Sequence, residues 1–297
     1  TFGSSNRASS SCGSSIYISS KLDKSLYTKE EIRAIRKQKR ENKLAKLAQK
    51  LLKIDPDLKK NNILVLKHGT KYGPEYVNKM FKMVTNNMTL PFNFYCLTEN
   101  AVGLDREIKH IDLPRGMDKV AGWWYKPYIF SKDLPIDGTI LYIDLDMVIC
   151  DNIDKLFTFY PKQYCVLRDF TRSMRPGWEK YNSSLIRFEK GSLDHLWVKF
   201  RRESHHIMGQ NFGDQDYLWN ETQGQATYWP DDWIRSWKWE IRNDRAYAPG
   251  GYRGNRKLAT IEKDAHAPPE CCIVAFHGDP NPHNCEDPYI VDRWHNI

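Results

Sequence analysis

Ile140–Ile149 reads ILYIDLDMVI, and this stretch decides the fold. Its first part, Thr139–Ile143, is apolar, aromatic or β-branched, which favours a buried strand. Asp144 and Asp146 follow at once, so two carboxylates stand at i and i+2 where the strand ends. Unpaired buried charge is costly, and in open α/β sheets ligands gather at the carboxyl ends of strands. We therefore expect Asp144 and Asp146 to bind a divalent cation, with an ordinary polar turn as the alternative.

Short β-rich segments alternate with helical ones on both sides of this strand. Ile63–Leu66 and Phe92–Leu97 read as strands that flank a helix opening at Gly73 and Pro74. Further strands are expected at Glu107–Leu113, Gln163–Leu167, Ser184–Phe188 and Ile273–Phe276, and helices at Ala121–Ser131, Leu193–Arg202 and Asp214–Trp219. The alternation predicts an α/β fold with a Rossmann-like, mostly parallel sheet flanked by helices.

The N-terminal region differs in composition from the rest. Residues 1–27 are rich in Ser, Gly and Asn, and we expect them to form a flexible arm. A basic amphipathic helix is predicted within 28–60, because Thr28 and Glu31 form a capping box and Pro56 follows the last apolar residues. Residues 61–297 would form one domain, with a mobile loop at 244–269 that is rich in Gly, Pro and charge.

Charge and cysteine usage restrict the partners and the compartment. The formal net charge of +8 in 297 residues favours polyanionic company. Much of the excess lies between Lys29 and Lys53, so this helix either contacts a polyanion or partner, or is simply solvated. No apolar run approaches the roughly 18 residues of a membrane helix, so we expect no integral membrane segment. The seven cysteines lack a CxxC pair, which favours a soluble protein in a reducing, cytoplasmic compartment.

Four segments in order resemble one enzyme family. Ile140–Ile149 looks like the DxD strand of GT-A nucleotide-sugar transferases, and in particular of glycosyltransferase family eight, the glycogenin-like and galactosyltransferase-like enzymes. Asn182–Ser184 resembles its Asn-containing sugar strand, Asp214–Asp216 its DQD motif, and Phe276–Pro282, reading FHGDPNP, its C-terminal metal and phosphate loop. The resemblance implies a GT-A catalytic domain over 61–297 and a metal-dependent, retaining hexosyltransferase that uses a nucleotide-diphosphate sugar, a UDP-sugar above all.

The resemblance also implies a role for each matching residue. The metal, Mn²⁺ or Mg²⁺, would be held by Asp144, Asp146 and His277. The donor-binding residues would be Lys67, Gly69, Thr70, Tyr72, Lys126, Asp144, Leu145, Asn182, Ser183, Gly278 and Asp279. Asn281 stands where the family often has a phosphate-binding Lys, and Lys126 is the expected substitute.

The catalytic set implied in the same way is Gln215, Asp214 and Asp216. Asp214 would hold sugar hydroxyls, and Gln215 would face the anomeric carbon opposite the leaving group. Since Gln is a poor covalent nucleophile, front-face attack through an oxocarbenium-like state is expected. The aromatic segment around Trp233 and Lys238 would contact the sugar or acceptor, unless it is a Trp-rich core strand.

Two other functions fit parts of the sequence. Sugar nucleotidyltransferases also combine an α/β sheet with metal carboxylates, but Lys67–Gly73 is a poor version of their Gly-rich basic loop. A non-enzymatic nucleic-acid or scaffold protein would use the basic helix and leave Asp144, Asp146, Asp214 and His277 without a joint purpose. The acceptor stays open among glycan, protein, lipid and modified nucleic acid.

Overall fold

The computed structural model describes residues 27–56, 60–117, 120, 122–244 and 264–297. The expected arm at 1–27 lies outside these residues except for Tyr27, and 245–263 of the expected loop at 244–269 lies outside them as well. The chain divides into two compact units, Thr1–Lys46 and Leu47–Ile297. None of the helices in the described part of the chain combines the length and the apolarity needed to cross a bilayer.

The first unit contains most of α1 (Lys29–Ile54), the predicted basic helix. Its capping box is present. The backbone N–H of Thr28 donates to Glu31 Oε2 at 2.7 Å, and the N–H of Glu31 donates to Thr28 Oγ1 at 3.2 Å. These two bonds satisfy backbone donors that a helix start otherwise leaves open.

The second unit is built on a seven-stranded sheet with the order β3-β2-β1-β4-β7-β6-β8. Strands β1, β2, β3 and β4 are parallel to one another, and β7 runs antiparallel between β4 and β6. The bounds are β1 Asn61–Lys67, β2 Phe92–Thr98, β3 Lys109–Ile111, β4 Thr139–Ile143, β6 Cys165–Arg168, β7 Tyr181–Glu189 and β8 Thr227–Tyr228. The mixed, mostly parallel sheet confirms the predicted fold class.

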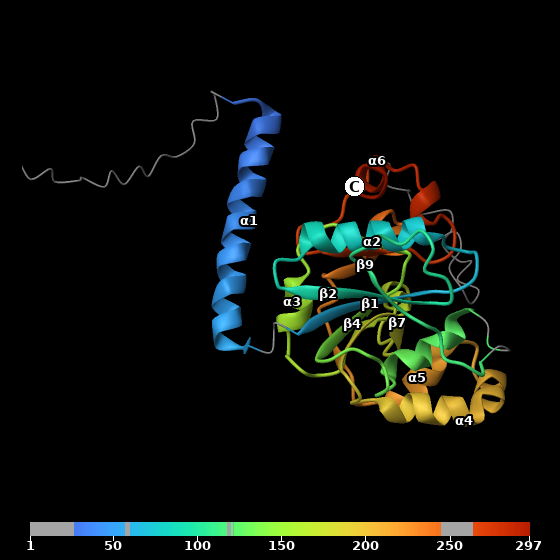
Figure 1. The fold of residues 1–297 in the computed structure, drawn as a ribbon. Coiled ribbons are helices and arrows are strands. Elements are labelled where there is room, and N and C mark those ends of the chain that lie inside the picture. The colour runs from blue at the N-terminus through green and yellow to red at the C-terminus, as the bar shows by residue number, and fades with distance from the viewer. Residues whose placement is uncertain (1–26, 57–59, 118–119, 121, 245–263) are drawn as a thin grey trace, which may run out of the picture. The chain divides into compact units, whose positions relative to one another are not determined.

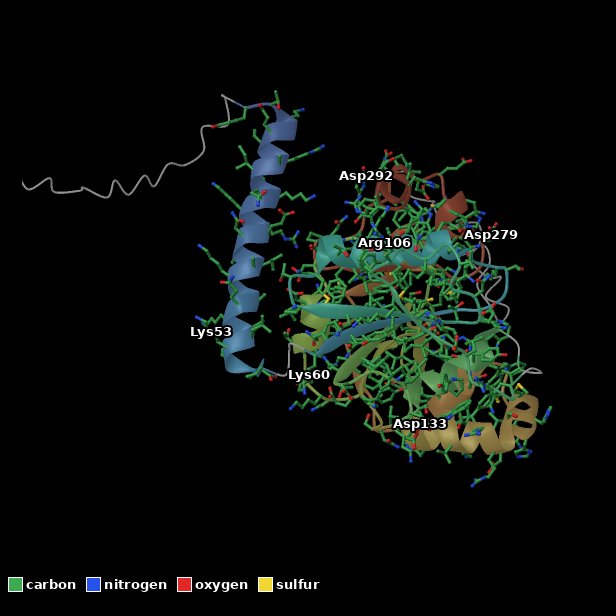
Figure 2. All side chains as sticks on the ribbon, viewed as in Figure 1. Lys53, Lys60, Arg106, Asp133, Asp279 and Asp292 are labelled. Atoms are coloured by element: carbon green, nitrogen blue, oxygen red, sulfur yellow. The ribbon has the colours of Figure 1, made fainter. Side chains whose placement is uncertain are left out.

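Helices cover both faces of this sheet (Figure 1). On one face lies α2 (Pro74–Asn87), whose buried Val77, Met80 and Val84 pack with Ile63 and Val65 of β1. The opposite face packs against the 3₁₀ helix η3 (Gly122–Phe130), α4 (Asp194–Gln210) and α5 (Asp214–Thr222). Side chains fill the space between these layers (Figure 2).

A small second sheet has the order β5-β10-β9, with bounds Met147–Ile149, Ile273–Ala275 and Ile234–Ser236. Strand β10 is antiparallel to β5 and parallel to β9. The remaining elements are α3 Asp154–Thr158, the 3₁₀ helices η4 Phe170–Ser173 and η7 Pro282–Asn284, the π-helix η5 Trp237–Ile241, and α6 Pro288–Trp294. The turn Asp144–Asp146 joins β4 of the large sheet to β5 of the small one.

Two predicted elements differ in detail. The Trp- and Tyr-rich helix is a 3₁₀ helix, and it contains Pro127, which has no N–H to donate. The weak strand at Glu107–Leu113 is reduced to the three residues of β3 at the sheet edge. The described cysteines are all free, and Cys96 and Cys165 are buried as small apolar side chains.

Candidate active site

A cavity of about 400 Å³ opens at the carboxyl ends of β1 and β4. Its walls come from the segment after β1, from η3, from the β4–β5 turn, from β7 and from the start of α5. Of the predicted residues it gathers Tyr72, Lys126, Asp144, Leu145, Asp146, Ser183, Asp214 and Gln215. Elements far apart in the sequence therefore place half of the expected donor-binding, metal and catalytic residues around one space.

Lys126 is the centre of a buried charge network. Its Nζ lies 3.2 Å from Asp144 Oδ1, 3.2 Å from Asp214 Oδ2 and 3.2 Å from Ser183 Oγ. Burial opposes its charge, but the two carboxylates outweigh burial and raise the pKa of Lys126 to about 12. Lys126 therefore stays charged and joins β4, β7 and α5 at the cavity floor.

Asp144 and Asp146 have different partners. Besides Lys126, Asp144 accepts a hydrogen bond from the hydroxyl of Tyr142. Asp146 Oδ2 accepts from the Tyr72 hydroxyl at 3.2 Å, and that hydroxyl also lies 3.2 Å from Asn281 Oδ1. Burial, reinforced by the charge of Asp144, raises the pKa of Asp146 above the usual range of an aspartate.

The DQD segment, Asp214–Asp216, begins α5, and its side chains point in two directions. Asp214 is buried and accepts from Ser183 Oγ at 2.7 Å, and burial raises its pKa. Gln215 is held at both ends of its amide: Ser183 N donates to Oε1 at 3.3 Å, and Nε2 donates to Asp169 Oδ2 at 3.3 Å. Asp216 is not among the cavity-lining residues and pairs with Lys180 at 3.2 Å.

The side chains of the predicted sugar strand, Asn182–Ser184, also point in different directions. Ser183, buried on β7, faces Lys126 and Asp214 in the cavity. The Asn182 side chain instead accepts from the backbone N–H of Ser184 at 2.8 Å and is not among the cavity-lining residues. The β6–β7 pairing shifts register next to it, which fits a local role for this amide.

His277 follows the small sheet, and its neighbour Phe276 donates its N–H to the Asp146 carbonyl at 3.0 Å. The imidazole Nε2 lies 2.6 Å from Ser236 Oγ, and the ring packs between Phe170 and Trp239. Burial lowers the pKa of His277 to about 4, so the ring is neutral. Its backbone is thus beside the β4–β5 turn while its ring is engaged with Ser236.

The rest of the FHGDPNP loop lies outside the cavity lining. The Lys238 ammonium donates to the His277 carbonyl at 3.1 Å and is near Gly278, which has a φ of +70°. The Asp279 carboxylate accepts from Asn284 Nδ2 at 3.0 Å. Lys238 therefore stabilises the backbone of this loop through its hydrogen bond to the His277 carbonyl.

Other predicted contact residues also lie away from the cavity. Lys67 is buried at the end of β1, and the Gly69 N–H donates to Glu99 at 2.7 Å. Thr70 is exposed and not among the lining residues. Trp233 packs edge-on to Phe159, beneath the ammonium of Lys155.

Seven cavity-lining residues are not among the predicted site residues: Leu66, His68, Lys71, Gly122, Trp123, Tyr142 and Ser184. Tyr142 was identifiable, because residues at i and i+2 of a strand share a face and Tyr142 stands two before Asp144. The side chain of Trp123 is 57% exposed, and the His68 ring lies 4.6 Å from that of Tyr125. No periodic signal marks residues in the turn after β1.

The donor set accommodates a divalent cation only in part. Asp144 and Asp146 supply the hard oxygen ligands that Mn²⁺ and Mg²⁺ accept. Among the described residues, however, His, Cys, Asp and Glu side chains nowhere gather in threes around a common point. The two carboxylates fit a metal whose other positions are filled by substrate phosphate and water, which is the usual coordination of Mg²⁺ with nucleotides.

No known protein family and no curated protein matches this chain. Solved structures do. The galactosyltransferase LgtC, in complex with donor and acceptor sugar analogues, aligns with a TM-score of 0.53 and 11% identity over 80% of this chain and 96% of that chain. The glycosyltransferase GlyE of Streptococcus pneumoniae TIGR4 aligns with a TM-score of 0.57 and 14% identity over 80% and 60%. At such identities the likeness establishes the fold, which is the one these glycosyltransferases share.

Proposed function

We propose that this chain is a metal-dependent glycosyltransferase that moves a hexose, with retention, from a nucleotide-diphosphate sugar to a hydroxyl acceptor. The observation that carries the proposal is the joint placement of Asp144, Asp146, Asp214 and Gln215 around one cavity, with Lys126 between the carboxylates. The cavity lies where open α/β sheets bind ligands, at the carboxyl ends of strands. The shared fold with LgtC and GlyE supports the reaction class.

Asp144 and Asp146 would hold the metal, Mn²⁺ or Mg²⁺, with oxygens of the donor diphosphate. The metal, when bound, neutralises the charge that develops on the departing diphosphate. His277 is the proposed third protein ligand, since it directly follows the residue bonded to the Asp146 carbonyl. For that role the imidazole would have to give up its contact with Ser236 and bind the metal instead.

Lys126 acts in this scheme as a positioning residue. It is 4% exposed and already neutralised by two carboxylates, so it fixes Asp144 for the metal and Asp214 for the sugar hydroxyls. The sequence suggested instead that Lys126 contacts the phosphate directly, because Asn281 stands where the family often has a phosphate-binding lysine. The negative charge of the diphosphate would then be neutralised by the metal and by Lys71, which lines the cavity.

Gln215 is proposed to stabilise the reacting carbon. The bond from its Nε2 to Asp169 fixes the amide, so the carbonyl dipole of Oε1 is oriented before the substrate arrives. A preorganised dipole of this kind favours an oxocarbenium-like state over the neutral donor. Tyr72 and His68 line the cavity next to β1. We propose that they contact the nucleoside and that its base is uracil.

The deciding experiment is hydrolysis of donors without acceptor. The purified protein is incubated with UDP-glucose, UDP-galactose, UDP-N-acetylglucosamine and GDP-mannose in the presence of Mn²⁺, and the released nucleotide diphosphate is quantified. We expect slow release from at least one UDP-sugar that stops when excess EDTA is added. Release that persists in EDTA would contradict the proposal, and so would the formation of nucleoside triphosphate and sugar 1-phosphate from the donor when pyrophosphate is added.

A further inference from the structure

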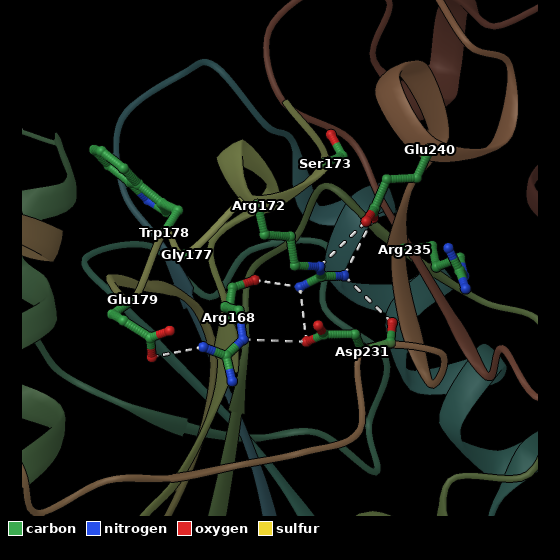
Figure 3. Close-up of a pocket in the computed structure, with 9 residues that line it drawn as sticks. All are labelled: Arg168, Arg172, Ser173, Gly177, Trp178, Glu179, Asp231, Arg235 and Glu240. Carbon is green, nitrogen blue, oxygen red and sulfur yellow. Dashed lines mark hydrogen bonds and ion pairs between the residues drawn. The ribbon is translucent and has the colours of Figure 1, made fainter. Parts of the chain in front are cut away.

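A second cavity, of about 550 Å³, lies in the same unit as the candidate active site (Figure 3). One wall consists of Arg168 at the end of β6, Arg172 on η4, and Trp178 and Glu179 before β7. The other wall comes from the β9–η5 region, including Asp231. Its volume falls in the range of roughly 300–1,000 Å³ typical of ligand pockets.

Both walls of this second cavity are tied to residues of the candidate active site. Asp169 follows Arg168, caps η4 through Thr171 N at 2.9 Å, and accepts the hydrogen bond of Gln215 at 3.3 Å. Next to Arg235 of the opposite wall, Ser236 ends β9 and contacts His277 at 2.6 Å. Residues directly adjacent in sequence to the two walls therefore bond to Gln215 on one side and to His277 on the other.

A third connection comes from the DQD segment. Lys180, directly after Glu179, pairs with Asp216 at 3.2 Å, and its carbonyl accepts from the Asp169 N–H at 3.0 Å. This gives Asp216 a structural reason for its position, because it anchors the wall of the second cavity to α5. A ligand that shifted this wall would move the segment next to Gln215.

The charges in the second cavity are balanced. Arg168 pairs with Glu179 at 2.7 Å and with Asp231 at 3.6 Å. Arg172 lies 3.2 Å from Glu240 and 3.5 Å from Asp231, and it also donates to the carbonyl of Ile234 at 2.9 Å. An anionic ligand would have to displace these carboxylates, although the protein as a whole carries a charge of +8.

The exposed polar side chains of the second cavity are better suited to bind the hydroxyl groups of a neutral ligand. Glu179 and Asp231 have side chains that are 65% and 47% exposed, and they can accept hydrogen bonds from a ligand while Arg168, whose side chain is 25% exposed, donates to it. Trp178 adds an aromatic surface, with the guanidinium of Arg175 5.5 Å from its ring centroid. Paired donors and acceptors beside an aromatic ring match a sugar, whose hydroxyls do both and whose ring has apolar faces.

We propose that this second cavity is the acceptor site and that the acceptor is a neutral carbohydrate. The proposal rests on the proposed glycosyltransferase function. The acceptor's polar groups bind between Asp231 and Glu179, and the hydroxyl to be glycosylated extends past Asp169 toward Gln215. Of the acceptor classes that the sequence left open, this selects a glycan and excludes nucleic acid from the cavity.

The test compares neutral and acidic saccharides on the full chain. Binding of lactose, cellobiose, maltose and a glucuronate-containing disaccharide is measured by saturation-transfer NMR without donor, and transfer is measured with the UDP-sugar that the protein hydrolyses. We expect at least one neutral disaccharide to bind and to accept sugar, and the acidic one to be weaker. Stronger binding of the acidic disaccharide, or no binding of any neutral one, would overturn the proposal.

Variants separate the acceptor site from the donor site. Asp231→Asn and Trp178→Ala should raise the acceptor KM about tenfold or more, the equivalent of roughly 1.4 kcal/mol, and leave donor hydrolysis unchanged. Asp137→Asn is the matched control, because Asp137 pairs with Lys190 at 3.6 Å on an exposed surface elsewhere. An unchanged acceptor KM in both cavity variants would refute the acceptor site. Absent donor hydrolysis with intact, Asp231-dependent disaccharide binding would refute the glycosyltransferase instead.

Discussion

Replacing Lys126 with methionine tests the charge network on which the candidate active site is built. The substitution keeps the length and the apolar stem of the side chain and removes one charge with its three hydrogen-bond donors. It leaves Asp144 and Asp214 facing the gap in a setting where Lys126 is 4% exposed and Asp214 6%. The variant therefore isolates the cation with little change of volume.

The expected loss of stability can be estimated from the distances between Lys126 Nζ and the two carboxylates. At 3.2 Å from each carboxylate and an effective dielectric constant of about 20, each pair contributes roughly 5 kcal/mol of Coulomb attraction. Desolvation of the buried ammonium offsets a large part of this sum. Removing one partner of a buried pair typically costs about 3–5 kcal/mol, because it leaves uncompensated charge behind. We expect Lys126→Met to lower the free energy of unfolding by that amount and to abolish donor hydrolysis.

Urea denaturation followed by tryptophan fluorescence measures the loss. Combining Lys126→Met with Asp214→Asn should cost less than the two single changes together, by about 1–3 kcal/mol, because the second change removes one of the stranded charges. Lys190→Met is the control, since its exposed pair with Asp137 contributes only about 0–1 kcal/mol. A Lys126→Met protein within about 1 kcal/mol of the wild type would refute the role assigned to this network.

Three further predictions address the proposed chemistry. Asp144→Asn and Asp146→Asn should each abolish Mn²⁺-dependent donor hydrolysis while the protein stays folded, and excess EDTA should do the same to the wild type; activity in either variant would exclude the metal site. Gln215→Ala should lower kcat by about tenfold or more and change the donor KM less; an unchanged kcat would move the catalytic role elsewhere. His277→Ala should weaken UDP binding in Mn²⁺ by about tenfold in calorimetry; unaltered affinity with a lower Tm would make the ring a packing residue beside Phe170.

The sequence predicted the large sheet well because its strands carry strong local signals. Ile63–Leu66 of β1 and Ile140–Ile143 of β4 are continuous runs of apolar or aromatic residues, as expected for strands buried on both faces. Met147–Ile149 was read as part of the same run as Thr139–Ile143. The turn Asp144–Asp146 instead redirects the chain into a second sheet, and only the pairing of Met147–Ile149 with Ile273–Ala275 makes it a separate strand. Such long-range pairing leaves no trace in a local pattern.

The candidate site was predictable where a motif fixes both the residue and its backbone position. Asp144, Asp214 and Gln215 follow from their places at the end of a strand and the start of a helix. Asp216 and Lys238 lie in equally suggestive stretches, but they point toward Lys180 and the His277 carbonyl. Asp216 lies two residues after Asp214 on the α-helix α5, and residues at i and i+2 of a helix do not share a face, so the spacing itself turns Asp216 away from Asp214. Side-chain direction in the π-helix η5 depends on tertiary contacts, so sequence spacing alone could not assign Lys238.

The charges of the cavity imply that cation and donor bind together. Asp144, Asp146 and Asp214 face one space, and Lys126 offsets only part of their charge. A diphosphate entering without a cation would meet like charge, whereas a cation without a diphosphate lacks several of its ligands. If each ligand improves the site for the other, the two affinities rise by the same factor, because coupling between binding sites is reciprocal. Burial, and after it the charge of Asp144, raises the pKa of Asp146, and a cation bound together with the nucleotide would offset both effects.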